Sequence, residues 1–421
     1  MSPDDQPTIQ AGIDAAIQGD TVLVADGTYT GPGNRDINFS GKGVVLKSEN
    51  GPEVTIIDCQ GDSLNPRRGF NFNSGEDTLT KIEGLQIING FSVNFSLYNI
   101  DQGGAVRCFS SSPVIRNCLF SSNSSVRGGA IYCKNSASPL IESCEFSNNF
   151  SYHYGGSLYC EDGGNPVVSN CAFNNCSSGA HAGSICIARS SPTIRNCVLL
   201  RPIALQNGGA VFIQDDSKPI FEGCTFYGAS GGTGSSFFIN QRPGKPSPTE
   251  PLFSKCIISF GTGDSAFYIS GAAPSFLCTN IFGTIEGDWS GPIASQFGID
   301  GNFSLNPRFC DTASDTLSLI SDSPCLPELN SCLLLIGAIG SGCSCCDEPG
   351  DADDNSDVNV GDATYIVKYI FQSGTAPPCC DQSDADGGGD VNIGDANFIV
   401  EFIFQSGAAP ICPNPGLLAC P

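Results

Sequence analysis

Residues 128–154 read GGAIYCKNSASPLIESCEFSNNFSYHY, and this stretch decides the fold because similar stretches precede and follow it. Six copies contain a proline, four further residues and a cysteine, and successive copies recur at a nearly constant interval. The pairs are Pro113/Cys118, Pro139/Cys144, Pro166/Cys171, Pro192/Cys197, Pro219/Cys224 and Pro251/Cys256. A fixed spacing of this length indicates a solenoid, in which each coil buries only the surface that its neighbours cover.

Within one coil, the apolar runs are three or four residues long, alternate with polar residues and are separated by small turn residues. This pattern has the period of a strand and leaves no room for a helix. Three short strands in each coil predict an all-β solenoid, a right-handed parallel β-helix. The cysteine of each coil and the aromatic residue two positions later, such as Cys144 and Phe146, are expected to point inward together.

A turn is expected directly before each cysteine of this ladder. Its residues form a column of Asn117, Ser143, Asn170, Asn196, Gly223 and Lys255. Asn and Gly tolerate left-handed backbone, so a tight bend there explains most of the column, with Lys255 as the exception.

The chain has 23 cysteines, too many for a typical cytosolic protein, which predicts a secreted one. Residues 1–20 contain no basic and apolar segment of the kind that makes a secretion signal. The coil cysteines stack at roughly 4.8 Å, farther apart than the Cβ atoms of a disulfide, and are predicted to be mostly buried thiols. The disulfide candidates lie in irregular sequence: Cys310, Cys325, Cys332, Cys343, Cys345, Cys346, Cys379, Cys380, Cys412 and Cys420.

Composition argues against two classes of partner. The formal net charge of −24 would repel the phosphates of nucleic acids and of anionic membranes. The sequence also lacks the run of roughly 18 apolar residues that a membrane-spanning helix needs. We therefore expect neither a nucleic-acid partner nor a membrane partner.

The first residues are predicted to cap the solenoid, because Ile9, Ile13 and Ile17 have the spacing of an amphipathic helix that would cover exposed strand edges. This run, PTIQAGIDAA followed by GDTVLVADGTY, and the coils after it resemble the pectin-lyase-like right-handed β-helix superfamily in its repeat-rich secreted bacterial form. The resemblance covers about residues 3–342 and implies the fold, which hosts lyases, hydrolases, adhesins and structural proteins. Residues 299–346 are predicted to form a closing coil with LLLIGAI as its last strand.

Two acidic loops of twelve residues lie near the C-terminal end, DADDNSDVNVGD at 351–362 and DADGGGDVNIGD at 384–395. Calcium takes six to eight oxygen ligands, and alternating oxygen donors closed by an acid at position 12 can wrap around one ion. Two Ca²⁺ ions are therefore predicted. Their predicted ligands are Asp351, Asp353, Asn355, Asp357, Asn359 and Asp362 in the first loop, and Asp384, Asp386, Asp390, Asn392 and Asp395 in the second.

A helix is expected after each loop, over the apolar runs ATYIVKYIF and ANFIVEFIF. Two such loop-helix units, with Asp rather than Glu at position 12, resemble a type I dockerin, an α-helical module of paired EF-hand-like loops that docks into cohesin domains. The likeness covers about residues 347–413 and implies a cohesin-like partner. Gly388 stands where the first loop has Asn355, which predicts a weaker second site or one that uses water.

The predicted domains are a cap at 1–20, the β-helix with its closing coil at 21–346 and the dockerin-like calcium-binding domain at 347–421.

Two groups of solenoid residues are candidates for ligand binding. The aligned GGAIYC strands give an outward column of Arg107, Tyr132, Tyr159, Cys186, Phe212, Phe238 and Tyr268. This column either presents aromatic rings to a polysaccharide or lies beneath a loop or the tail as a packing surface. Beside it, Asp162, Arg189 and Asp215 fall in register, either as a stack that binds a ligand or as a surface ion-pair ladder.

No compact catalytic cluster is found in the sequence, since a glycosidase needs two carboxylates within roughly 5 to 9.5 Å and the acids do not align on adjacent coils. Three functions remain open. The first is a secreted, non-catalytic β-helix with a calcium-stabilised dockerin-like tail, for extracellular assembly, surface display or glycan binding. The second is a polysaccharide lyase or glycoside hydrolase that its dockerin attaches to a scaffold. The third is a self-assembling structural subunit whose tail pairs with another copy.

Overall fold

The computed structural model describes residues 6–93, 102–312, 316–343, 346, 348–372 and 374–412. The chain divides into two compact units, which we call the solenoid unit (Met1–Ser304 with Ile336–Ala338) and the C-terminal unit (Leu305–Leu335 with Ile339–Pro421). Most of the predicted closing coil thus falls within the C-terminal unit. None of the helices in the described ranges has the length and apolar character that crossing a membrane requires.

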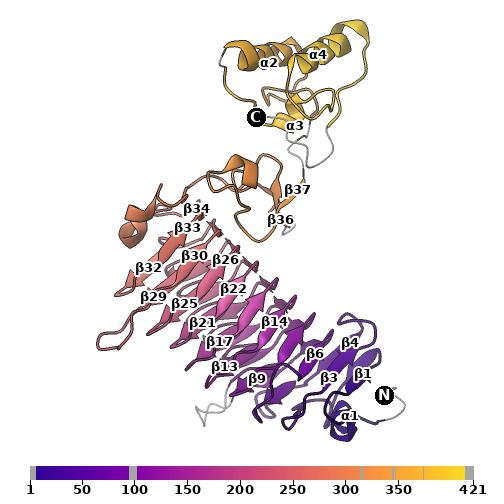
Figure 1. Cartoon of the computed structure of the whole chain (residues 1–421), viewed down its shortest axis with the longest axis vertical. Coiled ribbons are helices and arrows are strands. Elements are labelled where there is room, and N and C mark those ends of the chain that lie inside the picture. The colour runs from indigo at the N-terminus through magenta and orange to yellow at the C-terminus, as the bar shows by residue number, and fades with distance from the viewer. Residues whose placement is uncertain are drawn as a thin grey trace. The chain divides into compact units, whose positions relative to one another are not determined.

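The solenoid unit is a stack of parallel strands, in which each sheet takes one strand from each successive coil (Figure 1). The first sheet contains β1 (Thr21–Val24), β3 (Val45–Ser48), β6 (Lys81–Glu83), β10 (Val114–Arg116), β14 (Leu140–Glu142), β18 (Val167–Ser169), β22 (Thr193–Arg195), β26 (Ile220–Glu222), β30 (Leu252–Ser254) and β33 (Ser275–Leu277). The second contains β2 (Gly27–Tyr29), β4 (Thr55–Asp58), β7 (Gln86–Ile88), β11 (Leu119–Ser121), β15 (Glu145–Ser147), β19 (Ala172–Asn174), β23 (Val198–Leu200), β27 (Thr225–Tyr227), β31 (Ile257–Ser259) and β34 (Asn280–Phe282). The predicted parallel β-solenoid is therefore confirmed.

Two further sheets complete the coils. The third contains β8 (Phe91–Ser92), β12 (Ser124–Arg127), β16 (Phe150–Tyr154), β20 (Ser177–Ser178), β24 (Ile203–Asn207) and β28 (Ser230–Thr233). The fourth contains β5 (Phe70–Phe72), β9 (Val106–Phe109), β13 (Ile131–Lys134), β17 (Leu158–Glu161), β21 (Ile185–Ala188), β25 (Val211–Gln214), β29 (Phe237–Asn240) and β32 (Phe267–Ser270). The prediction of three strands in each coil is thus wrong for the central coils, which have four. The third sheet was missed because its strands are short and rich in serine, with little of the β-branched and aromatic character that marks a strand.

The interior of the solenoid unit consists of ladders, as predicted. Phe120, Phe146 and Phe173 are buried and stack with ring centroids 5.0 and 4.6 Å apart on successive coils. Every residue of the predicted turn column has left-handed backbone, with φ between 50° and 60°. Lys255 shares this conformation at φ 55°, so the backbone of the repeat is kept even where its preferred residue types are lost.

The predicted division of the cysteines is largely confirmed. The ladder cysteines from Cys118 to Cys256 and the column of Cys108, Cys133 and Cys160 are buried free thiols. Disulfides join Cys310 to Cys343 and Cys346 to Cys412, and Cys332, Cys379 and Cys380 are also disulfide-bonded. Cys325 differs from the prediction because it is a buried thiol. Cys345 and Cys420 lie outside the described residues.

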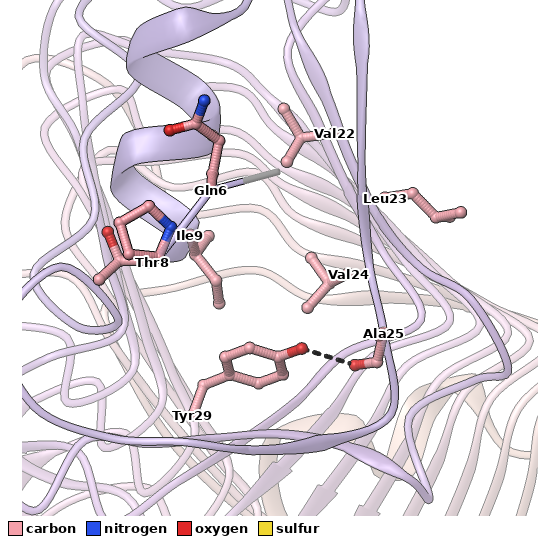
Figure 2. Close-up of a pocket in the computed structure, with 10 residues that line it drawn as sticks. Gln6, Thr8, Ile9, Val22, Leu23, Val24, Ala25 and Tyr29 are labelled. Atoms are coloured by element: carbon pink, nitrogen blue, oxygen red, sulfur yellow. Dashed lines mark hydrogen bonds between the residues drawn. The ribbon is translucent and has the colours of Figure 1, made fainter. Parts of the chain in front are cut away.

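Helix α1 (Ile9–Ala15) lies at the N-terminal end of the solenoid, and the Thr8 hydroxyl caps it by accepting a hydrogen bond from the amide of Ala11. Ile13 is buried as predicted, but Ile17 lies beyond the helix and is 70% exposed, so its predicted place on the buried face is wrong. A pocket of about 180 Å³ opens between α1 and β1, and the ring of Tyr29 forms part of its wall (Figure 2). Its described lining contains no charged side chain.

At the other end of the solenoid unit, the 3-10 helix η1 (Gly291–Gln296) buries Ile293, and Trp289 packs edge-on against Phe276. The predicted last strand at residues 333–339 is wrong, because these residues form no strand. Their backbone instead meets the solenoid through the amide of Gly337, which donates to the carbonyl of Lys255 at 2.8 Å.

The C-terminal unit contains a small sheet and a group of helices. The sheet has β35 (Phe309–Asp311), β36 (Thr316–Ile320) and β37 (Ser341–Cys343), and η2 (Pro327–Leu329) follows β36. The helices are α2 (Val360–Gln372), α3 (Cys380–Ser383) and α4 (Ile393–Gln405). The two predicted helices after the acidic loops are therefore confirmed, and they share a core that includes Ile366 and Ile399.

Candidate metal centres

Two groups of carboxylates converge in the C-terminal unit. Asp351, Asp353 and Asp362 each offer an oxygen within 4.8 Å of the others, and so do Asp384, Asp386 and Asp395. The first and last residues of each group are buried. Each group thus joins positions 1, 3 and 12 of an acidic loop, which are side-chain positions of a calcium-binding loop.

Backbone amides hold the carboxylates of the first loop in place. Both oxygens of Asp351 accept, from the amides of Asn355 at 3.1 Å and Ser356 at 2.7 Å. Both oxygens of Asp362 accept as well, from the amides of Asp353 at 3.2 Å and Asn359 at 2.8 Å. Asp353 differs, because its Oδ1 atom is buried without a hydrogen-bond partner among the described residues. A buried carboxylate oxygen without a partner is costly unless a cation approaches it.

The second loop repeats this pattern. Asp384 accepts from the amides of Gly388 at 2.9 Å and Gly389 at 2.7 Å. Asp395 accepts from the amides of Asp386 at 3.2 Å and Asn392 at 2.8 Å. The replacement of Asn355 by Gly388 therefore keeps the loop backbone and removes only a side chain.

Electrostatics in both groups favour a bound cation. Burial, followed by the charges of Asp386 and Asp384, raises the pKa of Asp395 to about 6. Burial likewise raises the pKa of Asp362 and of Asp384. Buried carboxylates this close together repel one another when ionised, and a divalent ion would relieve both the burial cost and the repulsion. Because every converging atom is a carboxylate oxygen, the donor set fits a hard cation such as Ca²⁺.

The remaining predicted ligands lie elsewhere in the loops. Asn359 and Asn392 use their Oδ1 atoms to accept from the amides of Gly361 at 2.7 Å and Gly394 at 2.6 Å, which holds the start of each helix. Their Nδ2 atoms donate to the backbone carbonyls of Asp357 and Asp390. Position 7 of a calcium loop binds the ion through its backbone carbonyl. The side chains at this position, Asp357 and Asp390, are exposed and are not needed as ligands. Asn355 also has an exposed side chain.

The aromatic column of the fourth sheet is in register, but most of it is covered. Tyr132, Tyr159, Cys186 and Phe212 are at most 5% exposed, whereas Phe238 is half-buried and Tyr268 is 42% exposed. The cover comes from neighbouring coils, because the rings of Tyr154 and His181 pack against this column. The interpretation as an open aromatic stripe is therefore wrong for these four residues. It overlooked the side chains of Tyr154, at the end of β16, and of His181, which pack over the fourth sheet.

The charged residues beside the column form ion pairs. Arg189 binds Asp162 at 2.5 Å and Glu161 at 3.0 Å. Burial alone would raise the pKa of Asp162, but its hydrogen bonds and ion pairs with Arg189 and Lys134 outweigh that effect and lower the pKa. Asp215, whose side chain is fully buried, pairs instead with Arg242.

Glu161 was missed by reasoning from the sequence. It is 7% exposed and accepts a hydrogen bond from the hydroxyl of Tyr132 at 2.6 Å. Arg127 lies 3.7 Å and Lys134 lies 3.4 Å from the same carboxylate. Its place at the end of β17, directly before Asp162, was the available signal. These contacts make Glu161 the centre of an ion-pair network.

Comparison with known proteins supports the fold. The family described as "Right handed beta helix region" matches residues 42–202. No curated protein matches the sequence significantly. Among solved structures, the catalytic domain of a GH87 alpha-1,3-glucanase has a TM-score of 0.37 at 9% identity over 66% of this chain and 59% of its own. The chain thus spans about three fifths of that domain.

Two further structures are similar at the same level. A pectin methylesterase from Yersinia enterocolitica has a TM-score of 0.31 at 13% identity, over 70% of this chain and 97% of its own. A PL6 family alginate lyase has a TM-score of 0.30 at 13% identity, over 74% of this chain and 50% of its own. Likeness this low carries no conclusion about function. With the matched family region and the register of the sheets, the parallel solenoid is a right-handed β-helix.

Proposed function

We propose that this chain is an extracellular protein in which a rigid, non-catalytic β-helix is joined to a calcium-dependent attachment module. The observation that carries the proposal is the pair of carboxylate groups, held by matching backbone hydrogen bonds in the two acidic loops. The buried, unpartnered Oδ1 atom of Asp353 supports a cation at the first site. The disulfides of the C-terminal unit support an oxidising, extracellular location.

Calcium would link the loops to the helices that follow them. Asp362 and Asp395 lie in the first turns of α2 and α4, and both helices pack around Ile366 and Ile399. An ion that binds position 12 therefore anchors each helix to its loop. At a free calcium concentration one hundred times the dissociation constant, one site stabilises the folded unit by about 2.7 kcal/mol.

The attachment surface would be the exposed apolar side chains of the same helices. Phe371 and Phe404 are 65% and 68% exposed, and Val360 and Ile393 are both 44% exposed. The members of each pair occupy equivalent positions in α2 and α4. Exposed aromatic and aliphatic side chains in a small, disulfide-bonded unit favour contact with another protein. A cohesin-like domain is the partner that the resemblance to dockerins implies, and a second copy of this chain is the alternative.

Isothermal titration of the full chain with CaCl₂, after removal of metals with EGTA, tests calcium binding. We expect two bound ions, and a loss of helical circular dichroism on chelation while the β-sheet signal remains. Asp353→Asn and Asp386→Asn should each remove one ion. Asp354→Asn is the matched control, because it removes an exposed charge from the first loop outside the carboxylate group. Absence of any calcium heat in the wild-type chain would contradict the proposal.

Attachment is tested by light scattering and by titration with a cohesin domain, each with and without calcium. A calcium-dependent increase in mass without a partner would favour self-assembly. The catalytic alternative has a direct test as well. Unsaturated products or new reducing ends released from pectate, alginate or alpha-1,3-glucan would replace the proposed non-catalytic role by an enzymatic one.

A further inference from the structure

A hollow of about 390 Å³ lies on the surface of the solenoid unit, where the second sheet turns into the third. Three successive coils contribute to it. Asp58, Gln60 and Asp62 come from the first coil, Asn89 and Phe91 from the second, and Ser124 with its neighbours from the third. We call this feature the turn hollow. Its lining includes no residue of the acidic loops or of the buried aromatic column.

The polar groups of the turn hollow are held in fixed positions. Asp58 Oδ1 accepts from the amide of Gln60 and from Asn89 Nδ2, both at 3.0 Å. Asp62 Oδ1 accepts from the amides of Leu64 at 2.7 Å and Asn65 at 2.8 Å. These hydrogen bonds use only the Oδ1 atom of each carboxylate and do not involve its Oδ2 atom. Rigidly placed polar groups around a concave surface are typical of sites for small ligands.

Two turn residues that line the hollow, Gln60 and Asn89, are exposed. Gln60 and Asn89 both have left-handed backbone, with φ of 50° and 54°. The amide of Gly61 donates to the carbonyl of Asn89 at 2.9 Å and fixes one coil on the next. The half-buried Phe91 adds an apolar surface. Its amide donates to the carbonyl of Arg67 at 2.7 Å, and its carbonyl accepts from the amide of Arg67 at 2.8 Å. The hollow thus combines hydrogen-bonding groups with one aromatic face.

This combination selects the chemistry of a ligand. Two carboxylates, two amide side chains and the serine hydroxyls can accept from and donate to a ligand rich in hydroxyl groups. The ring of Phe91 can pack against the C–H face of a sugar. The two carboxylates and the net charge of −24 would repel an anionic sugar. A metal ion fits less well, because the acid groups able to hold one, within the described residues, all lie in the C-terminal unit.

We propose that the turn hollow is a binding site for a neutral carbohydrate. A longer chain would continue along the third sheet. Ser124 pairs in register with Phe91 on one side and with Phe150 on the other. Phe150 therefore lies two coils from Phe91, roughly 9.6 Å away at the usual strand spacing. A second aromatic ring at this distance would meet another sugar ring of an extended, neutral oligosaccharide.

Saturation-transfer NMR and isothermal titration with the full chain test this site. The probes are cellohexaose, xylohexaose, mannohexaose and laminarihexaose, with hexagalacturonate as the acidic comparison. EGTA is present throughout, so that failure of the calcium proposal leaves this experiment unaffected. We expect at least one neutral hexaose to bind and hexagalacturonate to bind at least tenfold more weakly.

Variants locate the site. Phe91→Ala should weaken binding at least tenfold, and Asp58→Asn about three- to tenfold. Ser124→Trp should block binding by filling the hollow, and it keeps the side chain of Phe91 itself unchanged. The matched control is Asp26→Asn, because Asp26 accepts from Asn50 Nδ2 at 3.0 Å in a similar Asp–Asn pair outside the hollow. The proposal is overturned if no neutral hexaose binds, if hexagalacturonate binds more tightly, or if Phe91→Ala and Ser124→Trp both bind as the wild type does.

Discussion

The solenoid unit and the C-terminal unit achieve their folds by opposite means. The solenoid unit buries long ladders of aliphatic, aromatic and thiol side chains, and its core cysteines remain reduced. The C-terminal unit has a small core of residues such as Ala363, Ile366 and Ile399, and its described cysteines form disulfides, with the exception of Cys325. A core this small supplies little stability alone, so covalent links and metals become important.

The two units also differ in which groups lie next to their acidic side chains. In the solenoid unit, Asp162 and Asp215 each face an arginine. In the C-terminal unit, the carboxylates of each loop face one another. In the first arrangement an arginine of the same chain balances each carboxylate, whereas in the second the Ca²⁺ that we propose would balance them. Stability should therefore depend on internal packing in one unit and on oxidation and calcium in the other.

The largest effect is expected inside the solenoid. Phe146→Ala removes a buried ring between Phe120 and Phe173 and should lower the free energy of unfolding by about 3–5 kcal/mol. Urea unfolding followed by the β-sheet signal measures it, with the exposed Phe297→Ala as control. If added calcium restored the lost stability, it would contradict the expectation that calcium stabilises the C-terminal unit and not the solenoid unit.

Disulfide loss should act on the other unit. The Cys346–Cys412 disulfide closes 66 residues around both acidic loops. Removing it in the double variant Cys346→Ser/Cys412→Ser should cost about 4 kcal/mol on the chain-entropy estimate. Thermal unfolding of the helical signal should shift to lower temperature while the β-sheet transition stays. An unchanged helical transition would show that the disulfide contributes nothing.

Acid should weaken the solenoid through Asp215. Burial alone would raise the pKa of this carboxyl, but hydrogen bonds from Arg242 and the charges of Arg242 and Lys245 lower it. A lowered folded-state pKa gives stability that is present above the unfolded value of about 3.9 and is lost as the pH falls through the folded value. Asp215→Asn should therefore cost roughly 1–2 kcal/mol near neutral pH, since Arg242 is half exposed and solvent screens the pair.

Urea titrations of the wild type and of Asp215→Asn at neutral pH and at successively lower pH check this sign. The difference should disappear in acid. The exposed Asp26→Asn serves as the charge-matched control. A difference that grows on acidification would refute the role of the ion pair.

The smallest effect concerns the turn column. Lys255 adopts left-handed backbone at φ 55°, which costs a residue with a side chain roughly 1–2 kcal/mol. Lys255→Gly should stabilise the solenoid by about 0.5 kcal/mol, after the loss of the 2.7 Å ion pair with Glu222 and the entropy of glycine are subtracted. Glu222→Gln measures the ion pair separately. Destabilisation beyond the Glu222→Gln value would contradict the strain argument.

The comparison also shows which features a sequence can predict. The ladders that contain Cys144 and Phe146 could be predicted, because a fixed repeat stacks equivalent positions of successive coils on one another. This stacking does not depend on the angles between the sheets. The covering of Tyr159 by Tyr154 was not, because it depends on the angle at which the third and fourth sheets meet. Lys255 shows a similar limit, since the fold imposes the turn on a residue that does not prefer it.

In the acidic loops, the oxygen-bearing positions could be predicted from spacing alone. Which of them converge could not. Asn359 and Asp362 both carry suitable oxygens, yet Asn359 holds the start of α2 while Asp362 joins the carboxylate group. Side chains in each loop compete to accept hydrogen bonds from the same backbone amides, and the outcome decides between these roles. The pattern of residue types does not reveal that outcome. The turn hollow escaped prediction for another reason, because its residues come from three coils.

The reduced ladder has a consequence for how the chain matures. Burial raises the pKa of thiols such as Cys160 and Cys224, so that closed coils hide their sulfur atoms in an unreactive form. Before the coils close, the same atoms compete with Cys346 and Cys412 for any oxidant. Closure of the coils therefore has to precede oxidation of these thiols. An oxidant that acts too early would trap the protein with incorrectly paired disulfides.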